Sequence, residues 1–134
     1  LVKQSGAALI IDYGHLRSAL GDTLQAMKAH KFFKITENIG IADLTSHLDC
    51  ESLGRGFHKG GAKIAGAMTQ GQFLTAMGLE ARTQVLANNS AGEKRQNIIT
   101  ASERLANVTQ MGELFKVMAV TGGLDAAPYP FGQS

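Results

Sequence analysis

A short apolar run near the start of the chain constrains its fold more than any other feature. Residues 7–11 read Ala-Ala-Leu-Ile-Ile, and Asp12, Tyr13, Gly14 and His15 follow directly. A short run that is apolar on both faces is typical of a strand in a parallel sheet that is covered by helices on both sides. The sequence therefore predicts an α/β fold with a central strand over residues 7–12.

The polar residues after this run form the best local candidate for a site. In open α/β sheets, ligands bind outside the carboxyl ends of the strands. At that position Asp12 offers a carboxylate, Tyr13 a phenol and His15 an imidazole, and together these groups could surround a ligand. The alternative is that Asp12 only caps the turn while His15 is solvated, and the motif is too short to decide between the two interpretations.

The remaining segments alternate between strand and helix patterns. In chain order they are a strand or ribbon over 23–34 with an exposed basic turn, a half-buried strand over 42–49, a helix over 50–59, a strand over 63–68, two helices within 71–89, a helix over 91–108 and a strand over 114–120. Asp49 is the expected N-cap of the first helix, and Gly60-Gly61 its end. Gly78 separates the next two helices, and Ser90 with Glu93 forms a capping box.

Composition excludes several classes of protein. The 134 residues are 44% hydrophobic and 18% charged, which indicates one folded domain rather than a disordered segment. The net charge of +2 comes from a near balance of 13 basic and 11 acidic residues, so nucleic acid is not implied. The longest apolar run is too short to cross a membrane and no signal peptide is recognisable, so we expect a soluble intracellular protein.

Common catalytic and cofactor motifs do not account for the chain. Cys50 is the single cysteine, and His47-x-x-Cys50 alone has the spacing of metal ligands, whereas a zinc site needs two more partners. We therefore predict no metal site. The sequence contains no dinucleotide fingerprint, Walker loop or nucleophile elbow. Cations and aromatic residues alternate over 28–34, but a single such run is more often a solvated edge than a nucleic-acid interface.

Five sequence blocks occur together in the order found in one known family. They are residues 9–15 (Leu-Ile-Ile-Asp-Tyr-Gly-His), 21–26 (Gly-Asp-Thr-Leu-Gln-Ala), 42–49 (Ala-Asp-Leu-Thr-Ser-His-Leu-Asp), 69–74 (Thr-Gln-Gly-Gln-Phe-Leu) and 111–117 (Met-Gly-Glu-Leu-Phe-Lys-Val). On these blocks the chain resembles MidA, a family of bacterial and mitochondrial class I methyltransferases that depend on S-adenosyl-L-methionine (SAM). The blocks cover most of residues 7–120, so their joint match is far more specific than any single one.

The resemblance implies the C-terminal part of a Rossmann-like methyltransferase sheet. Residues 7–12 would be its fifth strand, 63–68 its sixth and 114–120 its antiparallel seventh, with a helical insert over 71–108 between the last two. The glycine-rich turn and the acidic strand end that hold SAM in this class have no counterpart in the chain. The resemblance therefore implies that residues 1–134 are the C-terminal portion of one domain, that the SAM-binding half lies upstream of Leu1, and that the chain alone is inactive.

The resemblance also implies an activity and partners. Mitochondrial members methylate an arginine of a complex I subunit in support of complex assembly, whereas bacterial members are less well defined. The implied cofactor is SAM and the implied partner is a protein substrate, without nucleic acid or membrane insertion. The implied location is the bacterial cytoplasm or the mitochondrial matrix, and a homo-oligomer is allowed. A non-catalytic binding or assembly module and a small nucleic-acid-binding domain are the alternatives.

Methylation of arginine requires carboxylates, because the guanidinium is protonated and must be oriented while it loses a proton. We assign this role to Asp12 and Asp43, with His15 as a proton relay and Tyr13 as a wall of the site. A second group of residues is expected on the substrate side. Its members are Gly14 at the end of the first strand and Thr69, Gln70 and Gly71 after the sixth, although the last three can equally form a helix-capping turn.

Overall fold

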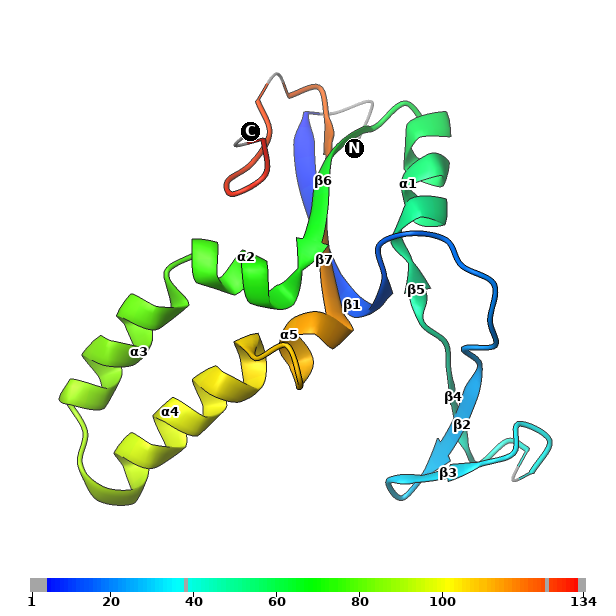
Figure 1. Ribbon diagram of the computed structural model, residues 1–134. Helices are drawn as coiled ribbons and strands as arrows, with labels where there is room; N and C mark the ends of the chain where they lie inside the picture. The colour runs from blue at the N-terminus through cyan, green and yellow to red at the C-terminus, as the bar shows by residue number, and fades with distance from the viewer. Residues whose placement is uncertain (1–4, 38, 125, 133–134) are drawn as a thin grey trace.

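The computed structural model describes residues 5–37, 39–124 and 126–132. Its main sheet contains four strands in the order β5-β1-β7-β6 (Figure 1). Their bounds are Gly6–His15 for β1, Leu48–Asp49 for β5, Lys63–Thr69 for β6 and Phe115–Gly122 for β7. Strand β7 is antiparallel to both β1 and β6, while β5 is parallel to β1. The strands predicted over 7–12, 63–68 and 114–120 are thereby confirmed as β1, β6 and β7, and the last is antiparallel as expected.

The core is formed on both faces of β7, whose residues 116–122 are all buried. On one face, helix α1 (Cys50–Lys59) packs Cys50 against Met118 and Val120. On the other face, Phe73 of helix α2 (Gln70–Ala76) stacks on Phe131 of the C-terminal segment over Val117 and Ala119. A strand covered on both faces explains the apolar run of residues 117–120.

Helix α1 begins and ends where the sequence predicts. The side chain of Asp49 accepts a hydrogen bond from the backbone N–H of Ser52 at 2.8 Å, which makes Asp49 the N-cap. After the helix, Gly61 has a φ of +82°, a conformation that glycine adopts readily. Leu53 and Phe57 lie one turn apart and are half-buried against the sheet.

The predicted helical insert between β6 and β7 is confirmed, and the structure differs from the prediction in three details. It consists of α2, α3 (Leu79–Asn88), α4 (Gly92–Ala106) and a short α5 (Met111–Leu114) that the sequence did not predict. Ser90 does not cap α4, because its backbone N–H is still bonded to Ala87 at the end of α3 and Ala91 takes the cap position. Helix α4 also ends at Ala106, before the turn that leads into α5.

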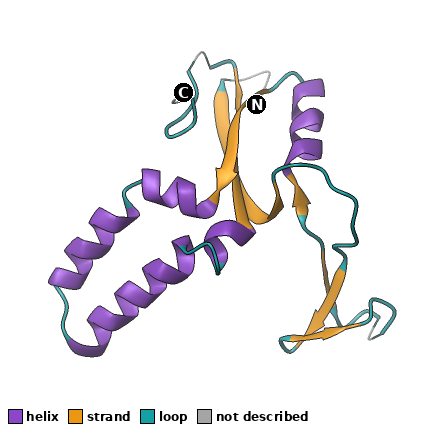
Figure 2. Cartoon of the chain, in the orientation of Figure 1, coloured by secondary structure: helices purple, strands orange, loops and turns teal. Residues whose placement is uncertain are grey.

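A small second sheet projects from the main body on the side away from the α3–α4 hairpin (Figures 1 and 2). It consists of β2 (Gln25–Lys28), β3 (Lys31–Phe33) and β4 (Asp43–Thr45) in the order β3-β2-β4, and we call it the β-arm. The predicted ribbon with an exposed basic turn is thereby confirmed. The single strand predicted over 42–49 was wrong, because the chain leaves the β-arm after β4 and joins the main sheet only at β5.

Part of the main sheet has little cover in the described residues. Leu9 and Ile11 of β1 are 47% and 50% exposed, on the face that β1 presents away from α1.

In the described part of the chain, no helix is both long and apolar enough to span a membrane.

Candidate functional site

All predicted site residues except Asp43 lie at one edge of the main sheet. Because β7 is antiparallel to both β1 and β6, the carboxyl ends of β1 and β6 point the same way. The register places Asp12 of β1, Lys116 of β7 and Thr69 of β6 in one row across the three strands. Residues 12–15 and 69–71 therefore lie at the same edge, as expected.

Asp12 is exposed at this edge, and one of its oxygens accepts a hydrogen bond from the backbone N–H of Tyr13 at 2.8 Å. Directly opposed residues of neighbouring strands share a face of the sheet, so Asp12 and Lys116 project to the same side. Lys116 is only 5% exposed. Its Nζ donates to the carbonyl oxygen of Glu113 and lies 3.5 Å from Oε1 of that residue. The row thus combines an accessible carboxylate with a buried, partnered cation.

Tyr13 belongs to the opposite face of β1 and is held in an aromatic cluster there. Its ring meets the ring of His47 edge to face at 5.7 Å and the ring of Phe115 in the same way at 5.8 Å. Tyr13 and Phe115 are also opposed in the register of β1 and β7. Asp12 and Tyr13 therefore project to opposite faces of the sheet. One ligand can contact both side chains only at the carboxyl end of β1, where it can reach around the sheet edge.

Gly14 and His15 are the last two residues of β1. They pair with β5, the short strand that leads into α1. Gly14 is opposite Leu48, and a Cβ atom at Gly14 would overlap the carbonyl oxygen of Leu48, so glycine is required. His15 is opposite Asp49. The hydrogen bond from the Ser52 backbone lowers the pKa of Asp49 most, and a bond from Ser18 at 2.7 Å and the nearby charge of His15 lower it further.

The segment after β6 is occupied by helix capping. Thr69 Oγ1 accepts from the N–H of Gln72 at 3.2 Å, and Oε1 of Gln72 accepts from the N–H of Thr69 at 3.0 Å, which is a complete capping box. Gln70 is buried and its Nε2 donates to the carbonyl oxygen of Leu105 at 2.8 Å. These contacts are those of a helix-capping turn, and a substrate role for Thr69, Gln70 and Gly71 stays a prediction.

Asp43 does not join this edge through any contact of the described residues. It is exposed on β4 of the β-arm, opposite Met27 of β2. A joint action of Asp43 with Asp12 therefore stays a prediction. Within residues 5–37, 39–124 and 126–132, no three His, Cys, Asp or Glu side chains are grouped so that they could hold a metal ion.

Sequence reasoning missed three residues at the edge of the sheet. His47 entered the sequence analysis only as half of a metal-ligand spacing, whereas its ring packs against Tyr13. Phe115 and Lys116 were treated as ordinary residues of the last strand. The antiparallel pairing of β1 with β7 brings both residues beside Asp12 and Tyr13, and no local pattern in the sequence shows that pairing.

The helix N-termini that follow β5 and β6 are both occupied by capping side chains. Nucleotide-like cofactors in α/β folds are held where a strand passes through a glycine-rich turn into a free helix N-terminus. The two strands that lead into helices here are β5 and β6. Asp49 fills the N-terminus of α1, and Thr69 with Gln72 fills that of α2. What the edge does offer is a carboxylate, an imidazole and aromatic rings, which suit the binding of a cationic acceptor.

A mixed sheet that ends in this strand order, with an antiparallel strand between two parallel ones, is the C-terminal part of a Rossmann-like methyltransferase fold. Comparison with known families agrees with this class. Residues 1–68 match the model of the family described as "Putative S-adenosyl-L-methionine-dependent methyltransferase". The match covers half of the chain, and the chain belongs to this family.

Curated relatives of the chain include mitochondrial enzymes. It is 34% identical to "Protein arginine methyltransferase NDUFAF7, mitochondrial" of Danio rerio, over 90% of this chain and 28% of the relative. The protein of the same name from Xenopus tropicalis is 38% identical, over 86% of this chain and 26% of the relative. The chain thus spans little more than a quarter of the length of these relatives.

Two solved structures from Burkholderia thailandensis are similar to the chain. An uncharacterized protein of the COG1565 superfamily has a TM-score of 0.85 and 27% identity, over 97% of this chain and 36% of the other. A second COG1565 member, a likely methyl transferase by its published description, was solved with S-adenosyl-homocysteine bound. It has a TM-score of 0.80 and 28% identity, over 91% of this chain and 33% of the other. SAM is the cofactor of the family.

Proposed function

We propose that the protein is a SAM-dependent methyltransferase that modifies arginine in a protein substrate. The similarity to the S-adenosyl-homocysteine-bound structure is the observation that carries the methyl transfer, because it extends over 91% of the chain at a TM-score of 0.80. The arginine acceptor is suggested by the names of the mitochondrial relatives. The edge with Asp12 suits such an acceptor because a guanidinium is a permanent cation.

We further propose that this chain is the C-terminal portion of one methyltransferase domain and that the other portion binds SAM. Two observations support this division. The helix N-termini at the carboxyl edge are filled by their own capping side chains, which leaves no cradle for the cofactor in the described residues. Leu9 and Ile11 are about half exposed on β1, where strands and helices of the other portion can cover them.

In this proposal the residues of the chain bind and orient the acceptor. SAM supplies the methyl group when bound, and transfer of that group is an in-line displacement. The protein therefore has to hold the guanidinium nitrogen in position and exclude water. Asp12 would accept a hydrogen bond from the guanidinium and favour loss of its proton. His15 would relay that proton to solvent, and Tyr13 would form a wall together with His47.

The finer assignment of the substrate follows the family resemblance. We propose that the acceptor is a subunit of respiratory complex I, or its bacterial equivalent, and that methylation supports assembly of that complex. The site of action would be the mitochondrial matrix or the bacterial cytoplasm. A non-catalytic role as an assembly module is the competing function, and it predicts acceptor binding without methyl transfer.

The test is transfer of labelled methyl from SAM to the acceptor protein by the complete methyltransferase that contains this chain. The expected product is methylarginine, identified by mass spectrometry. An acceptor whose target arginine is replaced by lysine serves as the control and should stay unlabelled. Binding of the acceptor without any labelled product would favour the assembly module and reject the enzyme.

A further inference from the structure

A groove of about 920 Å³ lies between helix α1 and strand β6, on the face of the sheet that α1 covers. Its floor is apolar and consists of Leu16, Gly54, Ile64, Ala67 and Met118. Its rim carries the side chains of Arg17, Arg55, His58, Lys59 and Lys63. Because β6 is the last strand in the order of the main sheet, the groove lies at the border of the sheet.

The charge of this groove is unbalanced. Glu51 is the one carboxylate among the residues that line it, against two arginines and two lysines. That carboxylate is already engaged, since Oε1 lies 3.0 Å from Arg55 and Oε2 accepts from the N–H of Ser18 at 2.8 Å. The groove therefore presents excess positive charge above an apolar floor, a combination that attracts an anionic ligand with an apolar part.

Helix electrostatics explain only some of these cations. His58 and Lys59 lie in the last turn of α1, where basic side chains offset the negative end of the helix dipole. Arg17 belongs to the segment after β1, and Lys63 is the first residue of β6. The groove thus collects positive charge from three separate segments, and the helix dipole accounts for one of them.

The shape of the groove favours an extended peptide over a compact anion. Helix α1 has 10 residues and is therefore about 15 Å long, which corresponds to about four or five residues of extended chain. The cations come from the C-terminal half of α1, from the segment after β1 and from the flanking strand, so they can meet several spaced carboxylates. One end reaches Arg17, two residues beyond His15 at the carboxyl edge of β1.

We propose that this groove binds an extended segment of the acceptor protein in which acidic and apolar side chains alternate. The acidic side chains would pair with the rim, and the apolar ones would lie on Ile64 and Ala67, which are both exposed. The identity of the occupant as the acceptor rests on the proposed function. The chemistry of the groove does not, because charge and apolar surface recognise the peptide whether or not methyl transfer follows.

Binding of short labelled model peptides to the complete methyltransferase tests the groove. The probe is a six-residue peptide of alternating Glu and Leu, compared with a Lys and Leu peptide and with a Glu and Ser peptide. The first should bind tightest, and its affinity should fall as salt is raised because exposed charge pairs are screened. Equal binding of the Lys and Leu peptide would overturn the proposal.

Charge reversal locates the binding. Lys59→Glu combined with Lys63→Glu should weaken binding of the Glu and Leu peptide about tenfold at low salt. The matched control is Arg82→Glu with Lys94→Glu, which changes the net charge equally on the exposed α3–α4 hairpin and should change affinity less than about twofold. Undiminished binding by the groove variant, or an equal loss in the control, would overturn the proposal.

The same groove variant separates this proposal from the enzymatic one. Methyl transfer to a short arginine peptide without acidic residues should be unaffected by Lys59→Glu and Lys63→Glu, while transfer to the intact acceptor should show a raised KM. If the unmodified protein transfers no methyl group at all, the proposed function fails, and the peptide titration still decides what the groove binds.

Discussion

Asp12 and Tyr13 are neighbours in the sequence but lie on opposite faces of β1. The two side chains therefore have different neighbours on β7, because Asp12 is opposite the buried Lys116 and Tyr13 is opposite Phe115. The carboxylate of Asp12 is accessible to solvent, and it also accepts a hydrogen bond from the backbone N–H of Tyr13. A structural and a catalytic role for Asp12 are therefore both compatible with its position, and substitution separates them.

In the complete methyltransferase, Asp12→Asn should leave SAM binding nearly unchanged and slow methyl transfer on the order of a hundredfold, equivalent to about 3 kcal/mol. Asparagine keeps a side-chain oxygen for the backbone hydrogen bond, so a purely structural Asp12 would tolerate the change. Single-turnover transfer gives the answer, and wild-type rates in the variant would end the proposal. His15→Gln is the companion variant, and loss of a proton relay should slow methyl transfer while SAM binding stays unchanged.

Gly14 offers a test of the link between β1 and β5. Gly14→Ala would place a Cβ atom against the carbonyl oxygen of Leu48, and we expect it to lower the free energy of unfolding by about 1–3 kcal/mol. Gly21→Ala is the matched control, because a Cβ atom there has no heavy atom within 4 Å. Chemical denaturation compares the two, and equal stability of both variants would show that the close approach at Gly14 is not required.

The cap of α1 predicts a pH dependence of stability. The folded-state pKa of Asp49 lies below its ordinary value of 3.8, mainly because of the Ser52 hydrogen bond. The carboxylate therefore stabilises the fold above about pH 3.8, and this contribution is lost as the pH falls through the lower folded-state pKa. Asp49→Asn keeps a capping oxygen without the charge. Its melting temperature should lie below wild type at pH 6, and the difference should shrink as the pH falls below 3.8. A constant difference would contradict the account.

At the scale of elements, local patterns predicted most helices and strands. The predictions were wrong where a segment pairs with, or is bonded to, a part of the chain that the local pattern does not include. Residues 42–49 alternate like a single strand, yet β4 and β5 pair with different sheets. Periodicity reports which side chains alternate and does not report the strand with which they pair. The capping box at Ser90 failed for a similar reason, since the end of α3 already holds that backbone. Long-range pairing placed His47 beside Tyr13, and no local pattern could show it.

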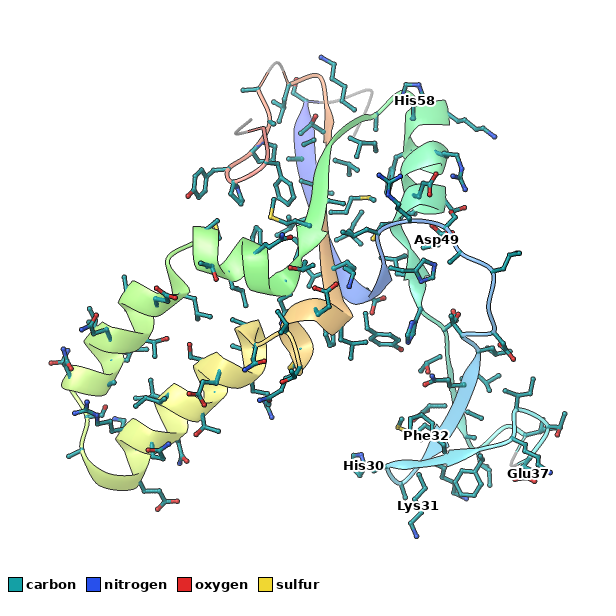
Figure 3. All side chains as sticks on the ribbon, viewed as in Figure 1. His30, Lys31, Phe32, Glu37, Asp49 and His58 are labelled. Carbon is teal, nitrogen blue, oxygen red and sulfur yellow. The ribbon has the colours of Figure 1, made fainter. Side chains whose placement is uncertain are left out.

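The elements should also differ in local stability. Residues 116–122 of β7 are buried, α3 buries only Ala87, and α4 has no buried residue in the described structure. Segments with few buried contacts open at lower free energy than the core. Figure 3 shows the α3–α4 hairpin with its side chains projecting from the main body of the chain. Hydrogen exchange should therefore be slowest in β7 and much faster across this hairpin. Equal protection of the hairpin and β7 would contradict this order.

At the scale of the whole molecule, strands β1, β6 and β7 and the family could be predicted from the sequence because five blocks occur in the order of one family. The spatial placement of the site could be predicted only in part. Residues 12–15 and 69–71 meet at one edge as expected, whereas Asp43 lies on the β-arm. The projection of the β-arm depends on pairing among its own strands, which the spacing of residues 23–49 did not reveal.

The central claim is that this chain binds the acceptor and that the other portion of the domain binds SAM. Calorimetry with SAM tests this claim most directly. We expect the complete methyltransferase to bind SAM with measurable heat. The 134-residue chain should give only heat of dilution, because its helix N-termini are filled by Asp49 and Thr69. Micromolar binding of SAM to the 134-residue chain, with heat proportional to its concentration, would show that the cofactor site lies within these residues and would contradict the account.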